Sequence, residues 1–249
     1  MPRTHAKLPR LFVADDLFDG ATLSLGKDHA NYVGNVLRKR EGGELVLFNG
    51  RQGAWLARLE NVTRKSAAAV LFEQIAAQPE PTDLWYGFAP LKSARLDYMV
   101  QKATEMGASA LQPVITEFTQ AARINLDRAR ANVVEAAEQC EVLQVPDVLE
   151  SIKLPALLEG WETVHADRHL VFADEAAPSA SPVEVLAPLA GNRVGLLVGP
   201  EGGFSPRERD MLLAKPFVIP ISLGPRILRA DTAAVAALAV MQSIIGDWR

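Results

Sequence analysis

Residues 193–249 read RVGLLVGPEGGFSPRERDMLLAKPFVIPISLGPRILRADTAAVAALAVMQSIIGDWR. Two short apolar runs in this stretch, 194–198 and 217–223, have the length of buried strands. Each run ends at a loop rich in glycine and charge, 199–204 and 224–231, and a helix is expected after each loop. α/β proteins form ligand crevices at the carboxyl ends of their parallel strands. The stretch therefore predicts an α/β domain whose ligand site is built from these two loops.

The first loop has the sequence Gly199-Pro-Glu-Gly-Gly203 and precedes a strong helix start. Ser205 is a favourable N-cap and Glu208, three residues later, completes a capping box. Glycines allow a ligand to approach backbone amides closely, although a plain tight turn explains a Gly-Gly pair equally well. The loop is neither a Walker A loop nor a GxGxxG motif, so it indicates neither a nucleoside triphosphate nor a dinucleotide.

The second loop places Ile227 and Leu228 between two arginines. These apolar side chains could hold a flat ring such as adenine against glycine backbone, or the arginines could simply pair with surface acids. Asp231 is expected to cap the helix that follows. That helix, 232–245, is apolar nearly all round, which predicts either a central position in the domain or a subunit interface.

Composition limits the classes of protein that this chain can represent. Hydrophobic residues make up 49% and charged residues 22%, which predicts a well-buried core. A net charge of −4 argues against binding nucleic acid through bulk charge alone. Cys140 is the only cysteine, which excludes an internal disulfide or a CxxC site, and we expect it to pack against an apolar helix face.

Two further absences shape the expectations for location and metal content. No apolar run is typical of a signal peptide or a membrane span, and with the lone cysteine this indicates a cytoplasmic protein without membrane attachment. The four histidines show no metal-ligand spacing, so no metal is expected.

The chain divides into a β-rich part, 1–78, a proline-containing linker, 79–83, and an alternating α/β part, 84–249. The β-rich part predicts a small barrel interrupted by one helix, 28–38. Its expected strands are 11–13, 21–25, 44–48, 54–59 and 67–72. The α/β part predicts a largely parallel sheet with helices on both faces. Its further expected elements are strands 84–88, 110–115 and 170–172 and helices 93–106, 126–140 and 182–189, with a short helix ending at Leu158.

The paired loops resemble a specific family signature. LLVGPEGGFSPRE, followed some twenty residues later by SLGPRILRADTA, is similar to the signature of RsmE-like enzymes, bacterial 16S ribosomal RNA uracil-N3 methyltransferases of the SPOUT superfamily. The resemblance spans almost the whole chain and includes the run Gln101-Lys-Ala-Thr-Glu-Met-Gly107 and the run Glu135-Ala-Ala-Glu-Gln139. It implies an N-terminal PUA-like RNA-binding β-barrel and a SPOUT domain with a deep trefoil knot. It also implies S-adenosylmethionine as cofactor, a homodimer, and 16S ribosomal RNA of the small subunit as partner.

The resemblance, together with the chemistry and charge of individual side chains, suggests site residues. It implies a cofactor pocket formed by Phe172, Ala173, Asp174, Leu197, Val198, Gly199, Pro200, Gly202, Leu223, Gly224, Ile227, Leu228, Thr232 and Ala233. Arg229 would stabilise charge on the uracil carbonyl oxygens, since a guanidinium stays protonated and cannot act as a base. Glu201 would act as base or orient the base edge. The expected RNA-binding residues are Arg3, Arg10, Arg38, Lys39, Arg40 and Lys92, although a run such as 38–40 is also common on plain solvated surfaces.

Two positions depart from the family pattern, and two other functions stay open. Glu141-Val142 stands where the family commonly has Gly-Arg, and Phe118 stands where it has arginine. A related SPOUT enzyme acting on ribose 2′-oxygens is one alternative, but those enzymes typically carry an Asn-containing Ser-Leu-Asn stretch where this chain has Ser222-Leu-Gly. A non-catalytic RNA-binding assembly factor is the other alternative.

Overall fold

The structure is a computed structural model that describes residues 8–63, 65–121, 123–177 and 181–248. Contacts within the chain divide it into two compact units. The first unit contains the described residues up to Glu80 together with Ala137–Val145, and the second contains the remainder. Each unit has its own sheet, so each is described by itself.

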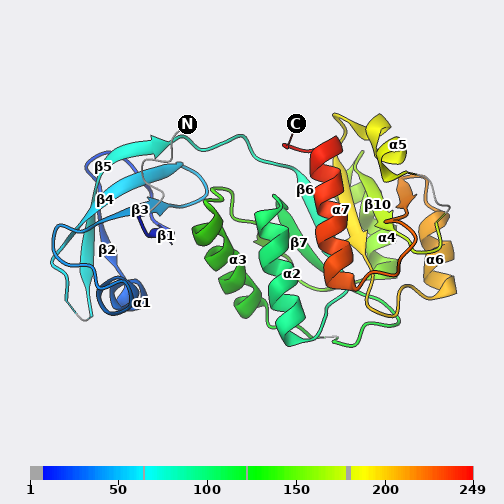
Figure 1. Cartoon of the computed structure of the whole chain (residues 1–249), viewed down its shortest axis with the longest axis horizontal. Coiled ribbons are helices and arrows are strands. Elements are labelled where there is room, and N and C mark those ends of the chain that lie inside the picture. The colour runs from blue at the N-terminus through cyan, green and yellow to red at the C-terminus, as the bar shows by residue number, and fades with distance from the viewer. Residues whose placement is uncertain (1–7, 64, 122, 178–180, 249) are drawn as a thin grey trace. The chain divides into compact units, whose positions relative to one another are not determined.

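The first unit is built on a five-stranded sheet (Figure 1). Its strands are β1 (Arg10–Phe12), β2 (Thr22–Leu25), β3 (Glu44–Phe48), β4 (Ala54–Glu60) and β5 (Ala67–Ala76), in the order β1-β3-β4-β5-β2. Alternate apolar residues of these strands point to one side, where Leu23, Leu45 and Leu59 form part of a buried cluster. Period-2 alternation is what a sheet with one buried face requires. The strands expected from the sequence are therefore confirmed, with β5 longer than expected.

The helix expected over 28–38 is only partly α-helical. It consists of α1 (Lys27–Asn31) followed by a π-helical turn (Tyr32–Val36). In that turn the amide of Leu37 donates to the carbonyl of Tyr32 at 2.9 Å, an i→i+5 bond. The wider turn changes which side chains share a face. Val33 is fully buried, whereas Val36, three residues later, is 61% exposed.

The second unit is a parallel sheet with helices on both faces, as expected. Its strands are β6 (Leu84–Phe88), β7 (Ala110–Ile115), β8 (Asp147–Val148), β9 (Ile152–Lys153), β10 (His169–Ala173), β11 (Val194–Val198) and β12 (Val218–Ile221). The strand order is β12-β10-β11-β6-β7-β8, with β9 also pairing with β7, and all these pairs are parallel. The helices are α2 (Ser93–Glu105), α3 (Leu126–Cys140), α4 (Leu154–His165), α5 (Pro182–Leu186), α6 (Pro206–Leu213) and α7 (Ala230–Ile244), with a 3₁₀ turn (Ala187–Leu189) after α5.

Aromatic side chains anchor one face of this sheet. Trp161 of α4 is fully buried and meets Trp85 of β6 edge-on, with 5.1 Å between ring centroids. It also stacks on Phe217 at 5.7 Å. On the opposite face α2 and α7 pack against each other, and both are seen in front of the sheet in Figure 1. The sheet is thus covered on both sides, which suits its near-continuous apolar strands.

A buried arginine closes the amino-terminal edge of the sheet. Arg168, whose side chain is 5% exposed, donates to the carbonyl oxygens of Asp83 and Val194 at 2.8 and 3.0 Å and forms an ion pair with the carboxylate of Asp83. Arg193 donates to the other oxygen of Asp83 at 2.7 Å. Burial, reinforced by both arginines, lowers the pKa of the nearby His165 to about 4. His165 is therefore neutral at physiological pH.

Three details of the second unit differ from the sequence expectations. The short helix expected to end at Leu158 is α4, which continues to His165 because Gly160 does not interrupt its apolar face. Cys140 is exposed instead of packed, because it lies at the last residue of α3, where the apolar stripe ends. Asp231 is not the cap of α7, because that helix begins at Ala230 and Arg229 occupies the N-cap position.

Candidate functional site

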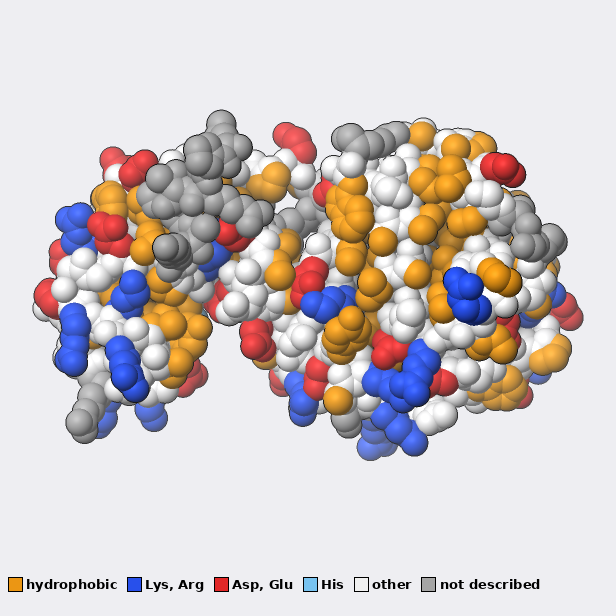
Figure 2. Space-filling view, viewed as in Figure 1, with side chains coloured by type: hydrophobic (Ala, Val, Ile, Leu, Met, Phe, Trp, Pro, Cys, Tyr) orange, Lys and Arg blue, Asp and Glu red, His pale blue; other side chains and the backbone are white. Residues whose placement is uncertain are grey.

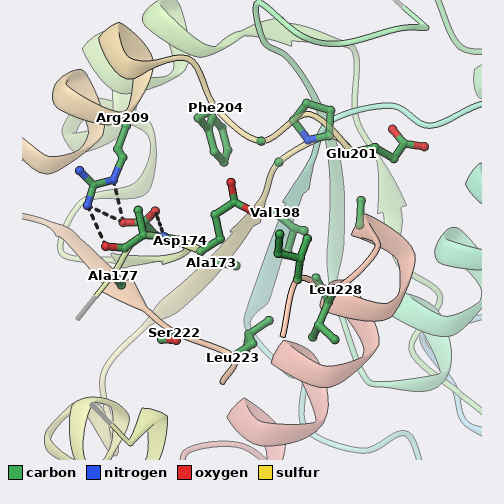
Figure 3. Close-up of a pocket in the computed structure, with 18 of the residues that line it drawn as sticks. Ala173, Asp174, Ala177, Val198, Glu201, Phe204, Arg209, Ser222, Leu223 and Leu228 are labelled. Atoms are coloured by element: carbon green, nitrogen blue, oxygen red, sulfur yellow. Dashed lines mark hydrogen bonds and ion pairs between the residues drawn. The ribbon is translucent and has the colours of Figure 1, made fainter. Parts of the chain in front are cut away.

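Three loops enclose a cavity of about 600 Å³ at the carboxyl ends of β10, β11 and β12 (Figure 3). They are the segments after Phe172, after Leu197 and after Ile221. The carboxyl ends lie side by side because β10 pairs in parallel with both other strands. The crevice predicted at this edge is therefore present, and its size is in the range of small-molecule sites.

The loop between β11 and α6 is held by a complete capping box. The hydroxyl of Ser205 accepts from the amide of Glu208 at 3.3 Å, and the Glu208 carboxylate accepts from the amide of Ser205 at 3.0 Å. The second carboxylate oxygen accepts from the amide of Glu117, after β7, at 2.8 Å. One buried carboxylate therefore ties the end of this loop, the start of α6 and the turn after β7 together.

Gly199 and Gly203 shape the same loop in different ways. A Cβ placed on Gly199 would lie 2.6 Å from the ring of Phe204, closer than atoms can approach without a shift. Phe204 in turn meets Phe172 edge-on at 5.0 Å. Gly203 has φ +69°, and its amide donates to the carbonyl of Pro200 at 2.9 Å. Both glycines are thus required by the geometry that forms this wall of the cavity.

An ion pair with a buried carboxylate forms another part of the cavity lining (Figure 3). The carboxylate of Asp174, whose side chain is 4% exposed, accepts from Arg209 of α6 at 2.9 and 3.0 Å. Its other oxygen accepts from the amide of Ala176 at 3.1 Å. The hydrogen bond with Asp174 raises the pKa of Arg209 above its usual value. The ion pair fixes the loop after β10 to α6. The two residues lie 35 positions apart in the chain, so no local sequence pattern predicts this contact.

The loop between β12 and α7 contributes the most exposed apolar side chain of the site. Ile227 is 85% exposed, although it belongs to the lining of the cavity. Gly224 has φ +100°, a conformation that glycine adopts far more readily than other residues. Covering an exposed isoleucine at the mouth of a cavity removes apolar surface from water, which favours the binding of a ligand or another surface there.

Most of the residues expected to hold the cofactor line this cavity. They are Ala173, Asp174, Val198, Gly199, Pro200, Leu223, Gly224, Ile227, Leu228 and Ala233. Four others do not line it. Phe172 and Leu197 are buried inside strands β10 and β11, Gly202 faces Phe118, and Thr232 is exposed on α7. The cavity also includes Phe204, Arg209 and Ser222, which sequence reasoning missed.

The two residues expected to act in catalysis occupy different positions. Glu201 belongs to the lining, and its carboxylate accepts from Arg95 of α2 at 3.1 Å. In Figure 3 it extends away from Val198 and Leu228. Arg229 is not among the lining residues; it is an exposed side chain at the N-cap of α7.

The expected RNA-binding residues among the first 80 positions fall into three groups. Arg3 lies outside the described residues. Arg10 is half-buried, with its guanidinium 5.5 Å from the centre of the Phe48 ring, and burial lowers its pKa. Arg38 and Arg40 are exposed and Lys39 between them is half-buried; Arg38 adopts φ +54° after the π-helical turn. This last group supplies exposed positive charge in the first unit.

Lys92 is exposed at the N-cap of α2, close in sequence to Arg95. Figure 2 shows Lys and Arg side chains gathered in the second unit where α2 and α7 begin, at the same edge of the sheet as the cavity. Among the described residues, no cluster of His, Cys, Asp and Glu could hold a metal ion. None of the helices that they form combines the length and hydropathy that a membrane crossing needs.

A parallel sheet with a cavity at its strand ends, accompanied by a small β unit, defines a two-unit α/β protein whose cavity has the size of a small-molecule site. The model of the RNA methyltransferase domain matches residues 78–242, and that of the RNA methyltransferase PUA domain matches residues 25–72. This chain belongs to the RNA methyltransferase family defined by the first of these models.

Named relatives agree with this assignment. The chain is 30% identical over 235 residues to ribosomal RNA small subunit methyltransferase E of Rickettsia conorii, covering 94% of each chain. It is 30% identical over 246 residues to the protein of the same name from Mycobacterium bovis, covering 96% of this chain and 93% of that one. The crystal structure of ribosomal RNA small subunit methyltransferase E from Neisseria gonorrhoeae bound to S-adenosyl methionine superposes with a TM-score of 0.84 at 28% identity, covering 97% of this chain and all of that chain.

Proposed function

We propose that this chain is an S-adenosylmethionine-dependent methyltransferase that modifies N3 of a uridine in 16S ribosomal RNA of the small subunit. The observation that carries the proposal is the cavity enclosed by the loops after β10, β11 and β12. It lies in the domain that matches the family model, and the relatives that cover the chain almost end to end are named for small-subunit ribosomal RNA.

The residues present fit the proposed cofactor. The cavity of about 600 Å³ offers apolar walls at Val198, Leu223 and Leu228 and the exposed Ile227 at its mouth, which suits a flat purine ring. Its lining contains the carboxylates of Asp174, Glu175, Glu201 and Asp210 against the guanidiniums of Arg209 and Arg226, and this excess of acidic groups suits a cofactor that carries a sulfonium and an ammonium group. When bound, S-adenosylmethionine supplies an activated methyl group.

The chain's own residues have three tasks in this reaction. They align the uracil with the methyl group, which can contribute up to about 7–11 kcal/mol through proximity and orientation. They stabilise the negative charge that develops on the uracil when its N3 proton leaves, a task we assign to the guanidinium of Arg229. They accept the N3 proton and orient the Watson–Crick edge, and we assign both roles to Glu201, whose carboxylate is fixed by Arg95.

RNA binding is assigned to both units. Uracil N3 takes part in base pairing, so the target must be unpaired or extruded from its helix. In the first unit, which includes the match to the PUA model, Arg38, Lys39 and Arg40 supply positive charge, and in the second unit Lys92 does so. Because the net charge is −4, selectivity depends on the shape of the RNA more than on bulk attraction.

The proposal includes three properties of the whole protein. Val235, Ala236, Ala239 and Val240 remain half-buried on α7, and Figure 2 shows hydrophobic side chains gathered over this helix, which supports a homodimer through that face. The trefoil knot formed by the cavity loops and a cytoplasmic location also remain part of the proposal.

Nucleoside mass spectrometry of 16S ribosomal RNA, with and without the gene, tests the reaction. Loss of 3-methyluridine in the deletion strain, restored by the wild-type gene, is the expected result. Unchanged 3-methyluridine would overturn the proposal. Calorimetry with S-adenosylmethionine distinguishes the enzyme from a non-catalytic assembly factor when it is combined with a methylation assay. An assembly factor would bind the cofactor but would transfer no methyl group to small subunits.

A further inference from the structure

Phe118 is an aromatic side chain left exposed beside the cavity loops. It is 43% exposed and follows β7 at the carboxyl edge of the sheet, the edge where the cavity lies. A Cβ placed on Gly202 would lie 3.4 Å from the Cβ of Phe118 and 3.7 Å from its ring, so the Phe118 side chain covers the backbone of the Gly199–Phe204 loop at that point. The side chain thus packs on one side and faces solvent with the rest.

The turn that carries Phe118 is unusually well fixed. The amide of Thr119 donates to the carbonyl of Thr116 at 3.1 Å, and the amide of Thr116 donates to the hydroxyl of Thr119 at 2.8 Å. The buried carboxylate of Glu208 accepts from the amide of Glu117 at 2.8 Å. Three hydrogen bonds fix the backbone that carries the ring, which lowers the entropic cost of using that ring for binding.

The loop on which Phe118 packs also carries an ion-paired carboxylate. Gly202, against which Phe118 packs, follows Glu201, and Glu201 is paired with Arg95 at 3.1 Å. An exposed ring that packs on a loop of the candidate site offers a stacking surface, which is one of the features by which unpaired RNA is recognised.

We propose that Phe118 is the stacking platform for an unpaired nucleobase of the RNA segment that enters the site. This inference rests on the proposed function, because an N3-methylated uracil must leave its base pair. Phenylalanine stands where the family pattern has arginine, and a guanidinium plane and a phenyl ring share the ability to stack on a base. Compared with arginine, phenylalanine at this position keeps a flat stacking surface but lacks the positive charge.

Four variants of the full chain test this assignment. Phe118→Leu and Phe118→Met both keep an apolar contact with Gly202 but have no aromatic face. The methionine side chain is the more flexible of the two. Phe118→Trp and Phe118→Arg each keep a flat stacking group. Initial rates of methyl transfer from tritiated S-adenosylmethionine are measured on small ribosomal subunits from a strain that lacks the gene, together with the cofactor Kd by calorimetry.

We expect the KM for subunits to rise about tenfold or more in Phe118→Leu and Phe118→Met, the scale of one lost base–aromatic stack. The Kd for S-adenosylmethionine stays within about twofold of wild type, because Phe118 does not line the cavity. Phe118→Trp and Phe118→Arg keep a KM within a few-fold of wild type, and Phe118→Arg gains a steeper dependence on salt.

The outcomes separate this inference from the proposed function. If wild-type protein methylates subunits and Phe118→Leu has the wild-type KM, the stacking role is refuted while the enzyme assignment stands. A KM that rises equally in Phe118→Leu and Phe118→Trp points to packing on Gly202 and also refutes it. If wild-type protein methylates nothing, the proposed function itself fails.

Discussion

Replacing Glu208 by alanine should destabilise the second unit through two specific backbone amides. The Glu208 side chain accepts from the amides of Ser205 and Glu117 at 3.0 and 2.8 Å, and the residue is only 7% exposed. A buried donor left without its partner costs about 1–3 kcal/mol. Ser205 is buried, whereas Glu117 is exposed and water can replace part of its lost bond. The expected loss in the free energy of unfolding is therefore about 2–4 kcal/mol.

The chain supplies a matched control for this variant. Ser181-Pro-Val-Glu184 opens α5 with the same Ser-Pro-x-Glu pattern that Ser205 and Glu208 form at α6. Within the described part of the chain, Ser181 makes no side-chain capping bond, and Glu184 is exposed. Glu184→Ala therefore loses only the interaction of a charge with a helix end, about 0.3–1 kcal/mol.

Urea unfolding followed by tryptophan fluorescence measures the difference, because Trp85 and Trp161 are buried in the core of this unit. The midpoint should fall clearly for Glu208→Ala at an unchanged m-value. Glu208→Gln, which retains one acceptor oxygen, should lie between wild type and Glu208→Ala. Equal losses below about 1 kcal/mol for Glu208→Ala and Glu184→Ala would refute the assignment of the two amide bonds as the source of stability.

Three further predictions concern the reaction, pH and helix termination. Glu201→Ala and Arg229→Ala should each bind S-adenosylmethionine but lose about 10²-fold or more in methylation rate, and full activity in either variant removes that residue from the mechanism. Burial lowers the pKa of His165 to about 4, so between pH 6.5 and 4 only the unfolded chain takes up this proton. Stability should therefore fall as pH falls through that window, and less so in His165→Gln, as measured by thermal unfolding across pH. Glu141 has φ +59° just after α3, a backbone conformation that strains residues other than glycine. Glu141→Gly should therefore raise the free energy of unfolding by about 1 kcal/mol, reduced by the lost attraction between Glu141 and Arg10. Chemical unfolding of the first unit measures this change.

Local sequence patterns predict the strands of this protein well. The bounds expected for β3, β6, β7 and β11 match the structure residue for residue, as do those of helix α3. These elements are apolar runs or stripes that end at glycine, proline or polar residues, so local signals suffice. The predicted bounds of a helix are wrong where a glycine suggests an end but the apolar pattern continues beyond it. α4 passes through Gly160 because its buried face continues to Trp161.

The candidate site likewise contains features that local sequence patterns predict and contacts that they do not predict. The capping box at Ser205 and the loops around Gly199 and Gly224 are encoded within a few residues, so pattern reading can find them. The ion pair of Asp174 with Arg209 exists only because the loop after β10 meets α6 in the folded sheet. Such contacts depend on strand order, which no local pattern specifies. The same reasoning explains the exposed position of Cys140, because only packing decides where an apolar stripe ends.

Glu208 shows how stability and the proposed chemistry meet in one residue. Its carboxylate fixes Ser205 at the end of one cavity loop and Glu117 in the turn that carries Phe118. In the proposed reaction, the loop assigned to the cofactor and the turn assigned to the base must keep a fixed distance, since misplacement of about 1 Å can cost about 10²-fold in rate. A buried carboxylate with two amide donors provides that constraint more rigidly than apolar packing, because both bonds are directional. The capping box of α6 therefore contributes to the geometry of the site as well as to the stability of the helix.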